Sequence, residues 1–159
     1  MRQQVFNIVI SVIIIILALF VNNLWITDKH VSCDIDIKLE QPEFLLSDKP
    51  DSNLLMEALD YYDIKHPHIV YAQAILETGH FRSRVCREYN NLFGLYDSKK
   101  RDYYRFNHWS ESVVAYMNCI QYKYEPQTDY YVFLTEIGYA EDSLYIDKLK
   151  KIVNKSKNQ

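Results

Sequence analysis

Glycine is scarce in this chain, and the positions of its glycines constrain the fold more than any other feature. The 159 residues include only three, at Gly79, Gly94 and Gly138. A domain with so little glycine uses it where the backbone needs a positive φ or where another group approaches closely. Two of the three lie within residues 72–94, and the third begins a polar and aromatic cluster at 138–142. This distribution predicts helices that end at these glycines and a cleft beside the helix ends.

Apolar residues recur at helical spacing through residues 51–154, which predicts a mainly α domain. Asp51 or Ser52 is placed to cap the first helix, and Pro67 is preorganised for the first position of the second. Helices are expected from 52 to about 62, at 67–78, at 81–87, from a Ser110 cap to before Pro126, at 130–137, and from an Asp142 or Ser143 cap to about 154.

One short extended element interrupts the helices. Residues 95–96 and 103–106 are rich in aromatic residues and are separated by the polar segment 97–102. Two such runs joined by a polar turn predict a β-hairpin. The expected fold class is therefore mainly α with a short β-hairpin.

The first 26 residues differ in composition from the rest of the chain. An apolar run from 8 to 21 is broken only by Ser11, and Arg2 precedes it. A spanning helix needs about 20 mostly apolar residues. Since no small-residue cleavage pattern follows, the sequence favours an uncleaved transmembrane signal-anchor over a cleaved secretion signal. Arg2 favours a cytoplasmic N-terminus, which places the rest of the chain on the periplasmic or extracellular side of the cytoplasmic membrane; cleavage would make it a secreted protein.

The chain divides into four parts by composition. Residues 1–26 form the predicted membrane anchor, 27–50 a polar spacer, 51–154 the folded domain and 155–159 a short tail. A single domain of this length is able to bury its own core.

Charge and cysteine content exclude several classes of protein. The formal net charge of −3 gives no basic face for nucleic acid. The three cysteines, Cys33, Cys86 and Cys119, are an odd number and so do not form a complete disulfide framework, although a Cys86–Cys119 bridge stays open. No cysteine or histidine pair has the spacing of metal ligands, and we expect neither a metal site nor a cofactor.

Glu77 is the clearest candidate for a catalytic residue. It lies in the last turn of the predicted 67–78 helix, on the same face as the small residue Ala74. The negative end of the helix dipole and partial burial both raise the pKa of a carboxyl there. A carboxyl that stays protonated near neutral pH is suited to general acid catalysis on a glycosidic bond. From spacing alone, a structural role as a cap or as an ion pair with Arg82 or Arg84 stays open.

Three motifs occur in a fixed order around this residue: ETG at 77–79, NNLFG at 90–94 and GYAEDSLYIDKL at 138–149. Together they resemble the glucosaminidase domains of glycoside hydrolase family 73, and the resemblance extends over about 51–153. It implies a lysozyme-like α+β fold and an endo-β-N-acetylglucosaminidase that hydrolyses peptidoglycan. The implied substrate is the glycan strand, cleaved at the β-1,4 bond between N-acetylglucosamine and N-acetylmuramic acid with Glu77 as acid.

The resemblance also assigns roles to residues around the acid. It places Tyr139 near Glu77, as a second candidate for the catalytic site. Asn91, Phe93 and Gly94 match the turn that shapes the floor of the cleft and are candidate substrate-binding residues.

The hairpin region supplies the remaining candidates. Asp97 and Asp102 are candidates for a second catalytic carboxylate, but both also suit turns. Substrate assistance by the 2-acetamido group is the alternative that needs neither. Tyr104 and Trp109 either stack on sugars as part of the substrate site or pack the hairpin onto the helices.

Two other functions stay open at this point. A lytic transglycosylase or a muramidase also works with one glutamate in a related helical fold. A catalytically weak module that binds cell-wall glycan is the alternative outside the enzymes, because the second acid is not identified.

Overall fold

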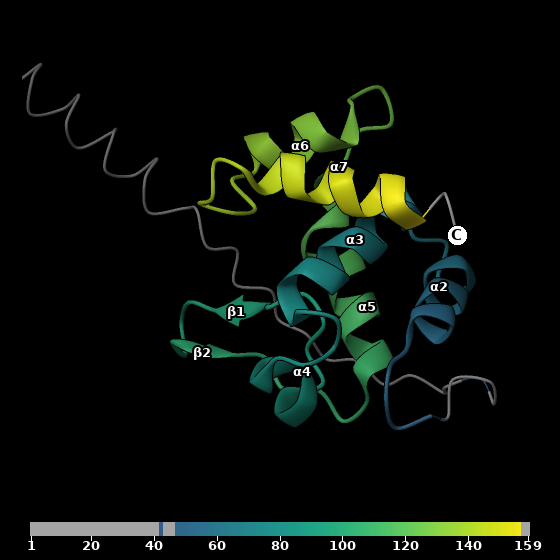
Figure 1. Ribbon diagram of the computed structural model, residues 1–159. Helices are drawn as coiled ribbons and strands as arrows, with labels where there is room; N and C mark the ends of the chain where they lie inside the picture. Colours follow the sequence, from purple (N-terminus) through teal and green to yellow (C-terminus); the bar gives the residue numbers. More distant parts are fainter. Residues whose placement is uncertain (1–41, 43–46, 157–159) are drawn as a thin grey trace, which may run out of the picture. The chain divides into compact units, whose positions relative to one another are not determined.

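The computed structural model of the chain describes residue 42 and residues 47–156, and they form a mainly helical domain with one two-stranded hairpin (Figure 1). This confirms the expected combination of helices and hairpin and is consistent with a lysozyme-like fold. The elements in order are α2 (Ser52–Tyr61), α3 (Pro67–Thr78), α4 (Arg84–Tyr89), β1 (Tyr96–Asp97), β2 (Asp102–Tyr103), α5 (Trp109–Cys119), the 3₁₀ turn η3 (Gln121–Lys123), α6 (Tyr130–Glu136) and α7 (Tyr145–Ser156).

The predicted membrane anchor at 1–26 lies outside the described residues, as does most of the spacer. Among the residues that are described, none of the helices is both long enough and apolar enough to cross a membrane.

Local capping explains where several helices begin and end. The Asp51 side chain accepts the N–H groups of Asn53 and Leu54 at 2.8 and 2.9 Å, which caps α2 as predicted. α3 runs from Pro67 to Thr78 and ends on Gly79, whose φ of 56° is left-handed. These short-range signals fixed the bounds of α3, the helix that carries Glu77.

The helix predicted at 81–87 instead forms as α4, Arg84–Tyr89. Gly79, His80 and Phe81 have successive positive φ values of 56°, 60° and 63°, so the chain cannot enter a helix until these residues have passed. The Ser83 side chain then caps α4 by accepting the N–H of Cys86. The prediction of an earlier helix start was wrong because three consecutive left-handed residues are not visible in the sequence.

Trp109 belongs to the interior rather than to a binding surface. It is the first residue of α5, capped by His108 instead of the predicted Ser110, and the side chain is 0% exposed. Its indole N–H donates to the carbonyl of Ser47 at 2.8 Å. Of the two roles left open for Trp109, the structure shows packing, because no ring face is available to a sugar.

The hairpin is shorter than expected and shifted by one residue on each strand. β1 and β2 are antiparallel, with Tyr96 opposite Tyr103 and Asp97 opposite Asp102. The two tyrosine rings meet edge to face with centroids 5.4 Å apart. Both aspartates, predicted in the connecting segment, therefore lie at the ends of the strands.

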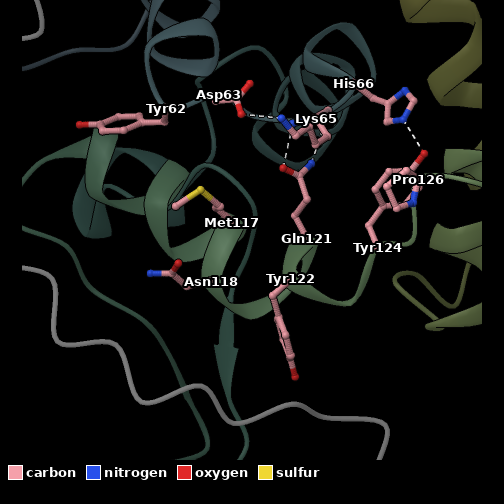
Figure 2. A pocket seen from close by; sticks show the side chains of 10 residues that line it. All are labelled: Tyr62, Asp63, Lys65, His66, Met117, Asn118, Gln121, Tyr122, Tyr124 and Pro126. Carbon is pink, nitrogen blue, oxygen red and sulfur yellow. Dashed lines mark hydrogen bonds and ion pairs between the residues drawn. The ribbon is translucent and has the colours of Figure 1, made fainter.

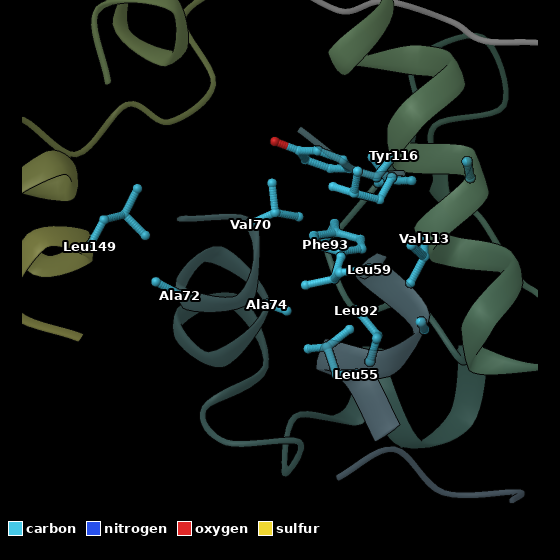
Figure 3. Packing of buried hydrophobic residues seen from close by; sticks show 14 of the residues in the cluster. Leu55, Leu59, Val70, Ala72, Ala74, Leu92, Phe93, Val113, Tyr116 and Leu149 are labelled. Atoms are coloured by element: carbon cyan, nitrogen blue, oxygen red, sulfur yellow. The ribbon is translucent and has the colours of Figure 1, made fainter. Parts of the chain in front are cut away.

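The core forms where α3 packs against both α2 and α7, while α2 also packs against α5. Figure 3 shows Leu92 and Phe93 of the turn that precedes the hairpin among buried side chains of these helices; the labelled ones are Leu55, Leu59, Val70, Ala72, Ala74, Leu92, Phe93, Val113, Tyr116 and Leu149. Insertion of Leu92 and Phe93 fixes this turn against the helical core. The turn is thereby held in place beside the end of α3.

The cysteines do not pair in the way that had been left open. Cys86 is a free, buried cysteine, and Cys119 is disulfide-bonded. A Cys86–Cys119 bridge is therefore excluded.

Candidate functional site

Glu77 lies in the last turn of α3 with its two carboxyl oxygens in different surroundings. The Tyr145 hydroxyl donates a hydrogen bond to Oε1 at 3.0 Å. Oε2 faces Gly94, where an added Cβ would lie 3.7 Å away. The residue as a whole is solvent-exposed, whereas its carboxyl is partly desolvated by the protein around it.

Burial raises the pKa of Glu77 above its usual value, and the hydrogen bond from Tyr145 opposes part of that shift. No ion pair involves Glu77 within the described part of the chain: Arg82 bonds the Gly79 carbonyl, and Arg84 pairs with Glu88. The structural alternative of an arginine partner is therefore wrong. The arrangement instead favours the protonated carboxyl that a general acid requires.

Tyr145 is the contact of Glu77 that the sequence reasoning missed. It is the first residue of α7 and is buried. Burial, together with the charge of Glu77, raises the pKa of the Tyr145 phenol, which stays neutral and able to donate. Its position inside the 138–149 motif was the available signal, but only packing of α7 on α3 identifies the atom that it meets.

Tyr139 lies near Glu77 without bonding to it. Its hydroxyl donates to the Phe93 carbonyl at 3.2 Å, and its ring centroid is 5.7 Å from that of Tyr145. Burial raises the pKa of Tyr139, with a further contribution from the Glu77 charge. Tyr139 therefore connects the segment before α7 to the turn at 90–94.

Within that turn, Gly94 borders the acid. Asn91 is buried and fastens the turn, donating to the carbonyls of Leu95 and Tyr104 at 2.9 and 3.0 Å and accepting the Leu95 N–H at 3.0 Å. Phe93 is also buried, with its ring centroid 4.5 Å from that of Tyr116. These two residues shape the turn from inside, whereas Gly94 leaves room above Oε2.

The Asp97 carboxylate bonds to residues of the hairpin turn. Oδ1 accepts the N–H groups of Lys99 and Lys100 at 2.9 and 3.1 Å, and the Lys100 ammonium lies 3.6 Å from Oδ2. These partners, the Lys100 N–H foremost, lower the pKa of Asp97. A carboxylate held in this way is a weak base.

Asp102 is likewise held by neighbours in sequence. It accepts the Tyr103 N–H at 2.8 Å and a hydrogen bond from Arg105 at 3.2 Å, and both lower its pKa, the Tyr103 N–H more strongly. Tyr104 is half-buried against the core and stacks on Phe106, with centroids 6.4 Å apart. The hairpin residues therefore mainly support one another.

A pocket of about 740 Å³ lies at the other end of α3 (Figure 2). Its lining residues are Tyr62, Asp63, Lys65, His66, Met117, Asn118, Gln121, Tyr122, Tyr124 and Pro126. Glu77 is not among them, so this pocket is separate from the candidate acid. Within the described residues no group of histidine, cysteine or acidic side chains could hold a metal ion.

A single protonatable carboxyl at a helix end, held by a tyrosine within a helical domain, is an arrangement suited to a glycoside hydrolase. A protein-family model described as Glucosaminidase, mannosyl-glycoprotein endo-beta-N-acetylglucosaminidase, matches residues 52–158. The match spans more than half of the chain, and the chain belongs to this glucosaminidase family, which implies a glycan substrate. A search of curated proteins found no match.

Proposed function

We propose that the protein is a peptidoglycan hydrolase, an endo-β-N-acetylglucosaminidase that cleaves the β-1,4 bond between N-acetylglucosamine and N-acetylmuramic acid. Glu77 is the general acid. The observation that carries the proposal is the carboxyl of Glu77, which belongs to an exposed residue, accepts a hydrogen bond from Tyr145 at 3.0 Å and has a raised pKa, inside a glucosaminidase domain.

The two carboxyl oxygens have separate tasks. Tyr145 donates to Oε1, so the acid proton resides on Oε2, on the side where Gly94 leaves space. Transfer of that proton to the glycosidic oxygen lets the bond to the anomeric carbon break while the leaving sugar departs as an alcohol. Tyr139 contributes by holding the Phe93 carbonyl and with it the turn that carries Gly94.

Substrate assistance is the mechanism that the hairpin favours. The lowered pKa values of Asp97 and Asp102, and their bonds to neighbouring N–H groups, leave both poorly suited to activating a water. In the proposed route the 2-acetamido oxygen attacks the anomeric carbon as Glu77 protonates the leaving oxygen. The deprotonated Glu77 then takes a proton from the water that attacks the anomeric carbon of the resulting oxazolinium ion, which reopens the acetamido group with net retention of configuration. Catalysis by Asp97 or Asp102 would instead require one of them to leave its turn contacts.

Digestion of purified peptidoglycan by the full-length chain tests the activity. Mass spectrometry of the fragments is expected to show new reducing ends on N-acetylglucosamine. New reducing ends on N-acetylmuramic acid would identify a muramidase, and anhydro-products a lytic transglycosylase. A wild-type chain that binds the cell wall but releases no fragment would be the glycan-binding module instead.

The anchoring of the chain is a second part of the proposal. The apolar composition of residues 1–26 supports a membrane anchor with the domain outside the cytoplasmic membrane. Protease added to intact spheroplasts is expected to remove the domain. Protection of the domain until the membrane is lysed would contradict this placement.

A further inference from the structure

We infer that Gln73 is a positioning residue for Glu77, acting through Tyr145 at the end of a one-way chain of buried hydrogen bonds. This inference rests on the proposed role of Glu77 as the acid. Gln73 lies one helical turn before Glu77 on α3 and is 0% exposed. A fully buried amide must find partners for its donor and acceptor groups, and the identity of these partners carries the argument.

At the catalytic end, the Gln73 amide determines where the Tyr145 hydrogen points. Gln73 Nε2 donates to the Tyr145 hydroxyl at 3.4 Å, and that hydroxyl donates to Glu77 Oε1 at 3.0 Å. An amide nitrogen has no lone pair to accept with, so the single phenol hydrogen is not drawn toward Gln73. It is directed to Glu77.

On its other side, the orientation of the Gln73 amide is set by two buried tyrosines. Tyr116 on α5 donates to Gln73 Oε1 at 2.7 Å, and the Tyr116 and Tyr130 hydroxyls lie 2.9 Å apart. Because the Tyr116 hydrogen goes to Gln73, Tyr116 accepts from Tyr130. If the Gln73 amide were reversed, its NH₂ group would face the Tyr116 hydroxyl, whose hydrogen already points toward Gln73.

The far end of the chain is fixed by backbone groups. Gln121 accepts the Lys65 N–H and donates to the Lys65 carbonyl, both at 2.8 Å (Figure 2). Backbone donors and acceptors cannot exchange roles, so the Gln121 amide has one orientation. Its second hydrogen goes to the Tyr130 hydroxyl at 2.9 Å, which leaves the Tyr130 hydrogen for Tyr116.

From Gln121 to Glu77, the hydrogen bonds that join successive side chains therefore have a single direction. This series of hydrogen bonds passes through η3, α6, α5, α3 and α7 in that order. It presents Glu77 with a fixed donor on Oε1 and keeps the acid proton on Oε2. A polar network that served only the stability of the core would need satisfied groups but no particular direction at Glu77.

The test compares variants in this series of hydrogen bonds with a matched control outside it. Gln73→Met keeps the length of the side chain and removes the donor to Tyr145, and Tyr116→Phe removes one oxygen. Tyr124→Phe is the control: Tyr124 also contacts Tyr130, and the substitution removes its hydrogen bonds to His66 and to the Thr128 carbonyl but no bond between Gln121 and Glu77.

The readout is the pH dependence of kcat and kcat/KM for glycan cleavage by the full-length chain. Tyr139 and Tyr145 are the titratable groups that face Glu77 among the described residues, and both stay neutral because their pKa values are raised. We expect Gln73→Met to lower kcat about tenfold, as loss of one oriented hydrogen bond to a charged group does, with little change in KM. Its basic limb moves to higher pH because the bond from Tyr145 to the carboxylate is weakened. Tyr116→Phe is expected to shift kcat and the limb in the same direction by a smaller amount.

Tyr124→Phe should lose thermal stability without a change in the pH profile. If the pH profiles of Gln73→Met and Tyr116→Phe match that of this control, the inference is overturned and the series of hydrogen bonds has a structural role only. If Gln73→Met does not fold, Tyr116→Phe decides alone. Glu77→Gln separates the two proposals. If this variant keeps its activity, the proposed function is wrong. If it is inactive while Gln73→Met and Tyr116→Phe behave like wild type, only the inference about Gln73 is wrong.

Discussion

Glu77 at the end of α3 and Asp97 in the hairpin are both carboxylates, but their surroundings act on them in opposite directions. Glu77 receives one hydrogen bond, from Tyr145, and burial raises its pKa. Asp97 receives two backbone N–H groups and a lysine, which lower its pKa. The helical region thus favours the protonated form of its carboxyl, while the hairpin stabilises the charged form. Only the first arrangement favours a proton donor.

The difference has opposite consequences for stability. The folded state binds the Glu77 proton more tightly than the unfolded chain does, so the free energy of unfolding falls as pH rises from the usual value of 4.5 through the raised pKa. Asp97 stabilises the fold at pH values above its usual pKa of 3.8, and this contribution is lost as pH falls through the lowered pKa. Near neutral pH, Glu77 therefore destabilises the fold and Asp97 stabilises it.

Glu77→Gln gives the largest expected effect. Removal of the acid proton should lower kcat about 10³-fold, within the usual range for a general acid. Thermal stability at pH 7 should equal or exceed that of wild type, because a partly desolvated charge is removed. Glycan cleavage assays and thermal unfolding check both parts. Glu57→Gln, an exposed glutamate on α2, is the matched control and should change neither quantity. Loss of stability in Glu77→Gln would show that the carboxyl serves the fold.

Gly94→Ala should have the next largest effect. Alanine at the Gly94 φ of 62° destabilises the fold by about 1–2 kcal/mol. The new methyl group would lie 3.7 Å from Glu77 Oε2, in the space proposed for the glycosidic oxygen, and we expect kcat/KM to fall several-fold. Gly79→Ala is a close control, since Gly79 has a φ of 56° but nothing within 4 Å of an added Cβ. Equal loss of activity in the two variants would show that backbone strain, not proximity to Glu77, is the cause.

Asp97→Asn should separate a turn residue from a catalytic base. The amide loses the charge that the Lys99 and Lys100 N–H groups stabilise, so the midpoint of thermal unfolding at pH 7 should fall. At a pH below the lowered pKa of Asp97 the difference from wild type should vanish. We expect kcat to stay within about threefold of wild type under substrate assistance, far from the 10²-fold or greater loss of a base. A loss of that size with unchanged stability would make Asp97 the second catalytic carboxylate.

Sequence was sufficient where the determining interaction is local. The bounds of α3 follow from Pro67 and Gly79, and the Asp51 cap lies beside the helix that it starts. The turn character of Asp97 was also expected, because the two N–H groups that donate to its carboxylate lie two and three residues further along the chain. The fold class and the family motifs were accessible for the same reason, as each motif is a short contiguous segment.

The environment of Glu77 could not be predicted in this way. Tyr145 is 68 positions further along the chain and meets Glu77 only because α7 packs on α3. The bond from Tyr116 to Gln73 joins residues 43 positions apart, and both are buried, so no short-range sequence pattern pairs them. Trp109 is an aromatic residue of the kind that stacks on sugars, but it is buried in the core, with its indole N–H donating to the distant Ser47 carbonyl. The acid was visible in the sequence, and its partners required tertiary packing.

Asp102→Asn is expected to have the smallest effect and completes the comparison of the two carboxylate environments. Asp102 is exposed, and its partners, the Tyr103 N–H and Arg105, lie within three residues of it. An exposed pair of this kind contributes little, because solvent screens the charges and the long side chain loses freedom when it is fixed. Arg105 also keeps its position over the Tyr89 ring, with the guanidinium carbon 3.6 Å from the centroid. Thermal unfolding, kcat and the pH profile should therefore match wild type within error. A pH profile that loses its acidic limb in Asp102→Asn would instead identify Asp102 as the base, and the hairpin would then hold a catalytic charge as well as a structural one.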